Sequence, residues 1–150
     1  MQPRPIRHRR ARRADFGALS ELLNAAGVRA PSDDRRGRSR FRRVVADLGA
    51  DLYVATIDDV LCGAVHATYV RQLTAEPSAT IELLIVAPDA RRRGVGASLF
   101  GLIVGRAQRR ACRTITLRAV VPAAAGAFFS HLGWRVAGTQ LLFDLTASAD

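Results

Sequence analysis

The segment of the sequence best suited to chemistry joins an apolar strand to an amphipathic helix. It reads RRRGVG, from Arg91 to Gly96, between the apolar run IELLIVAP and a helix that carries Leu99 and Ile103. Glycines at the start of a helix let the backbone approach a ligand closely, and the unpaired N–H groups of the first turn favour an anion there. Three arginines add positive charge beside these N–H groups. The pattern therefore predicts a cradle for a phosphate or diphosphate group.

Two common phosphate-binding loops do not fit these residues. The Walker loop ends in Gly-Lys-Ser/Thr, and the chain has no lysine. The dinucleotide-binding fingerprint needs a third glycine three residues after Gly96, where this chain has Leu99. The pattern that remains is Arg-x-x-Gly-x-Gly, placed after a strand and a turn at Pro88.

With this loop, the chain resembles the GNAT superfamily of acyl-CoA-dependent N-acyltransferases. The resemblance covers essentially all 150 residues, because the expected elements follow the family's order and AFFSHLGW lies in the expected last helix. It implies an α/β fold, a single GNAT-like domain over residues 1–150, with a mixed and splayed central sheet of about six to seven strands and about four helices. It also implies acetyl-CoA as cosubstrate, no metal, and direct transfer of an acetyl group to a primary amine in a ternary complex.

The family's cofactor contacts carry over to this chain by position. Ile85 and Val86 would pair through their main chain with the pantetheine arm, as an added strand does. Arg91 would lie beside the pyrophosphate, and Phe128 matches a phenylalanine of the family pattern. Ser98 would open the helix behind the pyrophosphate. The backbone amides that would hold the pyrophosphate are those of Arg92, Arg93, Gly94, Val95, Gly96 and Ala97.

The acceptor amine must be neutral to attack a thioester, so the enzyme needs a group that takes its proton. Glu82, the only acid in IELLIVA, is the candidate base; a salt-bridged structural glutamate is an equally weighted alternative. The family's general-acid tyrosine is replaced here by Phe129, and its cofactor-contacting asparagine by Pro122. Ser130 or water, and less favourably His131, remain as proton donors. A reaction without a dedicated acid is also open, because general-acid assistance is worth only about 10²- to 10⁴-fold.

The positive charge of the chain is concentrated in its first third. The net charge is +10, every basic residue is arginine, and residues 1–43 hold thirteen arginines against four acids. This distribution supports a second hypothesis, a non-catalytic CoA-binding protein or an arginine-rich module that binds nucleic acid or an acidic partner. The arginines lack interleaved aromatic residues for base stacking, so the enzyme is favoured. Its acceptor would be a small-molecule amine or a protein or peptide N-terminus.

The surrounding sequence predicts the elements that position these residues. We expect helices over residues 15–26 (capped by Asp15), 41–48 and 123–132, and a mobile loop over 30–40 that helps to shape the acceptor site. The expected strands are a basic edge strand within 4–13, a hairpin over 51–70, and strands at 79–86, 114–120, 134–136 and 141–145. In the hairpin, His66 and Tyr69 should lie on opposite faces, one of them toward the acceptor.

The cysteines and the lack of targeting or membrane segments indicate the redox state and location of the protein. Cys62 and Cys112 have no CxxC or histidine spacing, so we expect two reduced core cysteines and no metal site. There is no signal-peptide pattern and no apolar run long enough to span a membrane, which favours a cytoplasmic protein. Trp134 is expected in the core. The resemblance to the family also leaves a homodimer through the C-terminal strands open.

Overall fold

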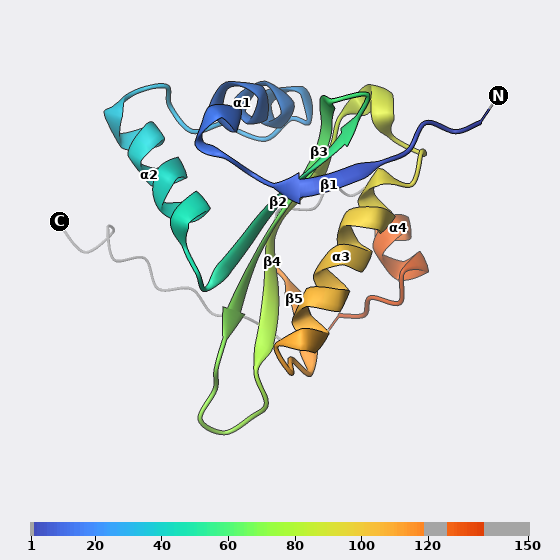
Figure 1. Ribbon diagram of the computed structural model, residues 1–150. Helices are drawn as coiled ribbons and strands as arrows, with labels where there is room; N and C mark the ends of the chain where they lie inside the picture. Colours follow the sequence, from blue (N-terminus) through green and yellow to red (C-terminus); the bar gives the residue numbers. More distant parts are fainter. Residues whose placement is uncertain (1, 119–125, 137–150) are drawn as a thin grey trace, which may run out of the picture. The chain divides into compact units, whose positions relative to one another are not determined.

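A computed structural model describes residues 2–118 and 126–136, in two compact units that divide after Ala119. The first unit follows the chain through β1 (Arg7–Arg10), the 3-10 turn η1 (Arg13–Asp15), α1 (Phe16–Ala25), α2 (Arg35–Ala46), β2 (Ala50–Ile57), β3 (Val60–Val70), β4 (Ser78–Val86), η2 (Pro88–Ala90), α3 (Val95–Arg109) and β5 (Thr114–Leu117) (Figure 1). The described part of the second unit contains α4 (Gly126–His131). None of the helices within these ranges is long and apolar enough to cross a membrane.

The five described strands form one mixed sheet in the order β1-β2-β3-β4-β5. All neighbours are antiparallel except β4 and β5, which are parallel. The hairpin of β2 and β3 was predicted and is confirmed. Its turn consists of Asp58 and Asp59, both with positive φ, of 50° and 63°. Such turns match the right-handed twist of the strands that they join.

Helices of the first unit cover both faces of this sheet (Figure 1). On one face, Leu19 and Leu22 of α1 pack in a cluster with Leu52, Val54 and Ala64 of the central strands. On the other face lies α3, whose buried residues form a stripe at helical spacing, namely Val95, Gly96, Leu99, Ile103 and Ala107. The sheet is therefore held between α1 and α2 on one side and α3 on the other.

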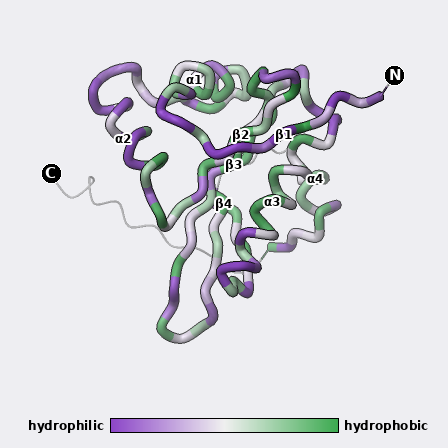
Figure 2. Tube along the Cα trace, viewed as in Figure 1, coloured by the Kyte–Doolittle hydropathy of each residue, from purple (hydrophilic) through white to green (hydrophobic). Residues whose placement is uncertain are grey.

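The segment 35–40, predicted to be part of a mobile loop, forms the first half of α2. Asp34 caps this helix, because its Oδ1 accepts a hydrogen bond of 2.8 Å from the Gly37 N–H. Gly37 allows the tight start, since a Cβ there would lie 1.8 Å from the Ser32 carbonyl oxygen. The prediction was wrong because these first turns carry arginines and no large apolar residue, so no helical periodicity appears there; Figure 2 shows their hydrophilic character.

Several other predicted elements differ from the described ones in number or bounds. The six to seven expected strands are not confirmed, because the described residues contain five. Residues 134–136 are not in a strand. The strand expected over 141–145, Pro122 and the start of the helix expected at 123 all lie outside the described residues. The helix expected over 15–26 is α1, but Asp15 does not cap it with its side chain. That carboxylate instead accepts hydrogen bonds from the Arg9 guanidinium and the Arg12 N–H.

Candidate functional site

The N-terminal end of α3 is a helix start without a side-chain cap. Gly94 is its N-cap residue, with φ +82°, a left-handed conformation that favours glycine. The hydrogen-bond ladder begins at Ser98, whose N–H donates to the Gly94 carbonyl at 2.9 Å. The N–H groups of Val95, Gly96 and Ala97 precede that ladder and have no intrahelical acceptor. The first turn therefore presents N–H groups and the positive end of the helix dipole to an anion.

Three exposed arginines stand directly before this turn. None of Arg91, Arg92 and Arg93 is in an ion pair with another described residue. Arg92 has φ +61°, in the left-handed region that costs about 1–2 kcal/mol for a residue with a Cβ. The loop thus keeps both an unfavourable backbone conformation and unneutralised positive charge, as a site for an anion would.

A glycine of β3 sets the position of this helix start. A Cβ on Gly63 would lie 2.7 Å from Val95 Cγ1 and 3.0 Å from Leu99 Cδ1. Both of those side chains are buried, so α3 approaches β3 more closely than any other residue would allow. The sequence reasoning did not single out Gly63, although a glycine in the middle of a strand pattern is the signal that would have found it.

The edge of β4 that faces away from β3 is open over its last residues. Pairing with β5 covers only the start of β4 and ends at Ile81↔Leu117. At the other end, the Ala87 N–H donates to the Cys62 carbonyl of β3 at 2.8 Å. Successive residues of a strand direct their N–H and C=O groups to opposite edges. Since Ala87 directs its N–H toward β3, the main-chain groups of Val86 point to the open edge. No described residue pairs there.

Glu82 is placed by a β-bulge at the point where β4 leaves β5. Ala67 lies opposite Ile81 and His66 lies opposite Leu83, so Glu82 is an extra residue without a partner in β3. A bulge re-aims its side chain, and bulges are frequent beside active sites. Its carboxylate accepts a 2.9 Å hydrogen bond from the Thr68 hydroxyl and retains 23% side-chain exposure.

Glu82 interacts electrostatically with one arginine and one histidine. Arg118 Nε lies 3.7 Å from Glu82 Oε2, a long and exposed ion pair. Burial lowers the pKa of His66, while the charge of Glu82 acts in the opposite direction. His66 lies opposite Leu52, and Tyr69 is hydrogen-bonded to Asp51 in contact with α3, so the two side chains are on opposite faces as predicted.

Asp51 is the centre of a buried ion network that the sequence analysis missed. Its carboxylate is 0% exposed and accepts hydrogen bonds from Arg10 at 2.7 Å, Arg106 at 2.5 Å and the Tyr69 hydroxyl at 2.7 Å. Burial raises the pKa of Asp51, but these donors and charges outweigh it and hold the pKa below its usual value. The network joins β1, β2, β3 and α3. Its members are too far apart in the sequence to form a motif.

The second unit carries the residues expected at the leaving thiolate. The Phe129 ring makes edge-to-face contacts with Phe128, at 5.2 Å between centroids, and with Trp134, at 5.8 Å. Ser130 is exposed, and its carbonyl accepts a hydrogen bond from the Gly133 N–H. Trp134 is partly buried.

The cysteines are both free, Cys62 buried and Cys112 partly buried. Burial raises the pKa of each thiol, which keeps both protonated and weakly nucleophilic. Cys112 lies beyond the C-terminal end of α3, at the opposite end of the helix from the loop. Within the part of the chain that the structure describes, no group of three or more histidine, cysteine, aspartate or glutamate side chains could hold a metal ion.

A comparison with known protein families identifies the family of this chain. The sequence model of the acetyltransferase (GNAT) family matches residues 18–134. The chain belongs to the GNAT family of acetyltransferases. No curated protein matches it.

Solved structures show the same fold at low sequence identity. An acetyltransferase from Trypanosoma brucei has a TM-score of 0.78 at 19% identity, covering 94% of this chain and 100% of that one. Glucosamine-6-phosphate N-acetyltransferase from Arabidopsis thaliana has a TM-score of 0.79 at 13% identity, covering 94% and 99%. Ribosomal-protein-alanine N-acetyltransferase from Brucella melitensis biovar Abortus 2308 has a TM-score of 0.74 at 16% identity, covering 94% and 100%. The GNAT fold predicted from the sequence is thereby confirmed.

Proposed function

We propose that this GNAT protein is an N-acetyltransferase that uses acetyl-CoA and transfers the acetyl group directly to a primary amine, with Glu82 as the base. The position of Glu82 carries the proposal. It is an extra residue in β4, one position after the pairing with β5 ends, and its carboxylate is partly exposed. In this proposal both units form one domain over residues 1–150, and the family match across the division supports it.

Acetyl-CoA would be held by main-chain groups and by arginines. The first-turn N–H groups of α3 and the side chains of residues 91–93 suit a pyrophosphate in charge and number of donors. Val86 would pair with the pantetheine arm at the open edge of β4, and the same alternation gives Leu84 this role. Ile85 was also predicted to pair there. The N–H and C=O groups of Ile85 point toward β3, however, so we propose that Ile85 makes only an apolar contact with the pantetheine arm.

Each step of the reaction can be assigned to a described residue or to water. The neutral amine nitrogen attacks the thioester carbonyl, a C–N bond forms and the C–S bond breaks. Glu82 takes the proton lost by the amine, directly or through one water. The thiolate leaves and takes a proton from water or from Ser130, because Phe129 has no hydroxyl to donate. The lack of a tyrosine slows this last step without preventing it, since a thiol has a pKa of about 8.5.

The binding half of the proposal is tested by titrating acetyl-CoA into the protein in a calorimeter. A carboxylate in the cradle should repel the pyrophosphate, so Gly94→Asp and Gly96→Asp should weaken binding at least tenfold, about 1.4 kcal/mol. Gly94 has open space around its Cα, but its φ of +82° strains any residue with a Cβ, so thermal melting must first show that Gly94→Asp is folded. Gly101→Asp is the matched control, because Gly101 lies in an exposed position of the same helix and also has open space. Equal affinity in all four proteins would refute the cradle.

The catalytic half is tested with Glu82→Gln and, as control, Glu76→Gln at an exposed loop position. The assay measures the release of the CoA thiol in the presence of a panel of amines. The panel should include glucosamine 6-phosphate and an alanyl peptide, because two structural neighbours are named for a sugar phosphate and for a ribosomal-protein alanine. Glu82→Gln should lower kcat about 10²- to 10⁴-fold with acetyl-CoA affinity unchanged. The defect should shrink at high pH, where the amine is already neutral; a purely structural glutamate would not give that pH dependence. Tight binding without turnover of any amine would favour the non-catalytic alternative.

A further inference from the structure

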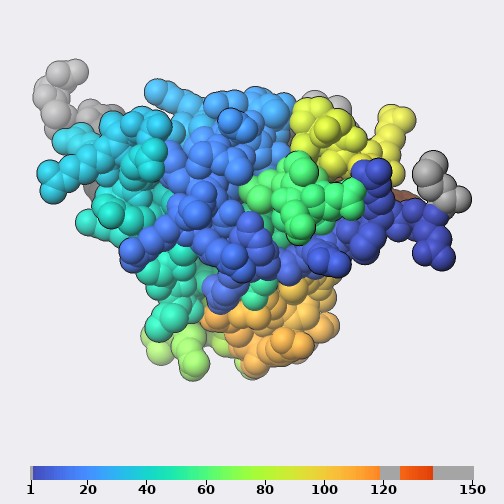
Figure 3. All heavy atoms as spheres, turned by 45° about the horizontal axis from the view of Figure 1, so that its top comes forward, coloured from blue at the N-terminus to red at the C-terminus, as the bar shows by residue number. Residues whose placement is uncertain are grey.

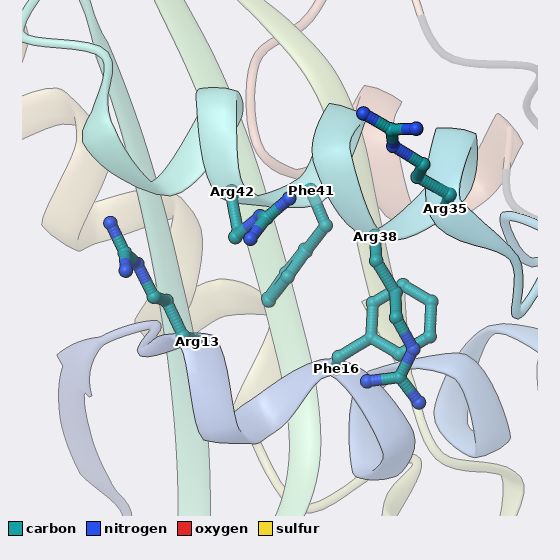
Figure 4. A pocket seen from close by; sticks show the side chains of 6 residues that line it. All are labelled: Arg13, Phe16, Arg35, Arg38, Phe41 and Arg42. Atoms are coloured by element: carbon teal, nitrogen blue, oxygen red, sulfur yellow. The ribbon is translucent and has the colours of Figure 1, made fainter.

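A pocket between the start of α1 and the helix α2 is lined by arginines and phenylalanines. Its volume is about 300 Å³, and its lining residues are Arg13, Phe16, Arg35, Arg38, Phe41 and Arg42. Figure 4 shows Arg13 reaching up from η1 toward α2, where Phe41 and Arg42 lie. The elements that form it share one face of the first unit, blue to cyan in Figure 3. None of the lining residues belongs to β4, to the loop 91–94 or to α3, so this pocket is distinct from the acetyl-CoA site.

The pocket contains positive charge that no carboxylate neutralises. Arg38 is the exception, because its Nε lies 2.6 Å from Asp33 Oδ1 and its guanidinium lies over the Phe16 ring, 4.8 Å from the centroid. Arg13, Arg35 and Arg42 are exposed and form no ion pair with another described residue. No acidic residue lines the pocket. An anion that enters it therefore meets three guanidinium groups that are not already occupied.

The arginines of α2 outnumber the two carboxylates near its start, where Asp34 caps the helix and Asp33 pairs with Arg38. The first turn of this helix is rich in arginine and has no acidic residue, although the positive end of a helix dipole favours negative charge. Arg36 and Arg40, and likewise Arg38 and Arg42, are like charges four residues apart, each pair destabilising a helix by about 0.2–0.5 kcal/mol. An arginine-biased composition explains why these residues are not lysine. It does not explain why they gather at one helix start and around one pocket.

The floor of the pocket is apolar. Phe16 is 5% exposed and Phe41 is partly buried, and the two rings are in edge-to-face contact with centroids 5.4 Å apart. A ligand would place a hydrocarbon part against these rings and an acidic group among the guanidiniums above. A cavity of this volume is at the lower end of the range for small-molecule sites, about 300–1,000 Å³.

We propose that this pocket binds a small organic phosphate, with its phosphate between Arg13 and Arg42 and its apolar part on Phe16 and Phe41. A phosphate is favoured over a carboxylate because its doubly charged head can receive bidentate hydrogen bonds from more than one guanidinium. Binding would also offset part of the repulsion among the clustered arginines of α2. The proposal does not rest on acetyl transfer.

The test is calorimetric titration of the whole protein with phenyl phosphate, inorganic phosphate, benzoate and benzyl alcohol. Phenyl phosphate should bind most tightly, because only this probe supplies both a dianion and a ring, and benzyl alcohol should not bind. The double variant Arg13→Gln/Arg42→Gln should weaken phenyl phosphate binding at least tenfold. Its matched control is Arg36→Gln/Arg40→Gln, which removes the same charge from exposed positions outside the pocket and should change the affinity less than twofold. Thermal melting of each variant checks that it is folded.

Three results would overturn this proposal. Equal weakening by both double variants would mean that phosphate is attracted by the general charge of the surface. Benzoate binding as tightly as phenyl phosphate would exclude a site that selects phosphate. Loss of binding in Gly94→Asp, with binding retained in Arg13→Gln/Arg42→Gln, would place the phosphate at the start of α3. Failure of the proposed acetyl transfer leaves all of these readouts unchanged, so the two proposals can be refuted separately.

Discussion

Replacing Asp51 with asparagine should destabilise the first unit by about 2–4 kcal/mol. Removing one partner of a buried ion pair typically costs about 3–5 kcal/mol, because the remaining charge is left in the protein without compensation. Here the remaining charges are not fully buried, since the side chains of Arg10 and Arg106 are 48% and 23% exposed. Water can therefore recover part of the lost interaction, and asparagine still accepts one hydrogen bond. Both effects place the expected loss below the upper end of that range.

The loss is measured by urea denaturation followed by circular dichroism. Tryptophan fluorescence is unsuitable, because Trp134 is the only tryptophan and lies in the second unit. For a chain of this length, the expected destabilisation corresponds to a fall in Tm of roughly 5–15 °C. The control is Asp33→Asn, which breaks the exposed pair with Arg38 and should cost about 0–1 kcal/mol.

The pH dependence gives a second, independent check on Asp51. Because its pKa is lowered in the folded protein, its contribution is present above the unfolded pKa of about 3.9 and is lost as the pH falls through the folded value. The difference in stability between the native protein and Asp51→Asn should therefore be constant near neutral pH and shrink below about pH 4. If Asp51→Asn costs no more than Asp33→Asn at pH 7, the network does not hold α3 on the sheet and the reasoning is refuted.

Three further predictions concern a close packing contact, a strained backbone position and the ion pair of Asp15. Gly63→Ala should destabilise by about 1–3 kcal/mol and weaken acetyl-CoA binding, because its Cβ would collide with Val95; melting and calorimetry check this, and an unchanged protein would contradict the close packing. Ala111→Gly should stabilise by about 1 kcal/mol in a urea titration, since Ala111 has φ +58°; a destabilised variant would contradict it. The pKa of Asp15 is lowered in the folded protein, chiefly by hydrogen bonds from Arg9, so its carboxylate should stabilise the fold above about pH 4 and lose this effect in acid. The difference in unfolding free energy between the native protein and Asp15→Asn should therefore shrink as the pH falls below about 4, and a difference that stays constant in acid would contradict this.

The sequence predicted the elements whose burial leaves a periodic pattern. The hairpin, β4 and α3 were found because β-branched residues alternate in the strands and apolar residues recur at helical spacing in α3. The first half of α2 was missed for the opposite reason. Its start is specified by a cap at Asp34 and by the contact of Gly37 with the Ser32 carbonyl, and neither produces an apolar period.

The candidate site was predictable in its local part only. The cradle at the start of α3 is continuous in the sequence, so its glycines and arginines identify it directly. Asp51 could not be found in this way, because its three partners come from β1, β3 and α3. The pocket beside α2 could not be predicted either, since its lining residues were assigned to an edge strand, a loop and two different helices.

Glu82 shows why residue type alone does not define this site. As the only acid in an apolar strand it was an evident candidate, yet a structural role was equally consistent with the sequence. The structure adds the register of Glu82 with both neighbouring strands, which supports the proposed role as base. The bulge opposite β3 makes Glu82 an extra residue, and the pairing with β5 ends at Ile81, directly before it. One interruption of the sheet thus leaves the last residues of β4 without a partner strand on one edge and turns a carboxylate out of the regular alternation beside that edge. The Glu82→Gln assay, with its pH dependence, separates this role from that of a glutamate held by Thr68 and Arg118.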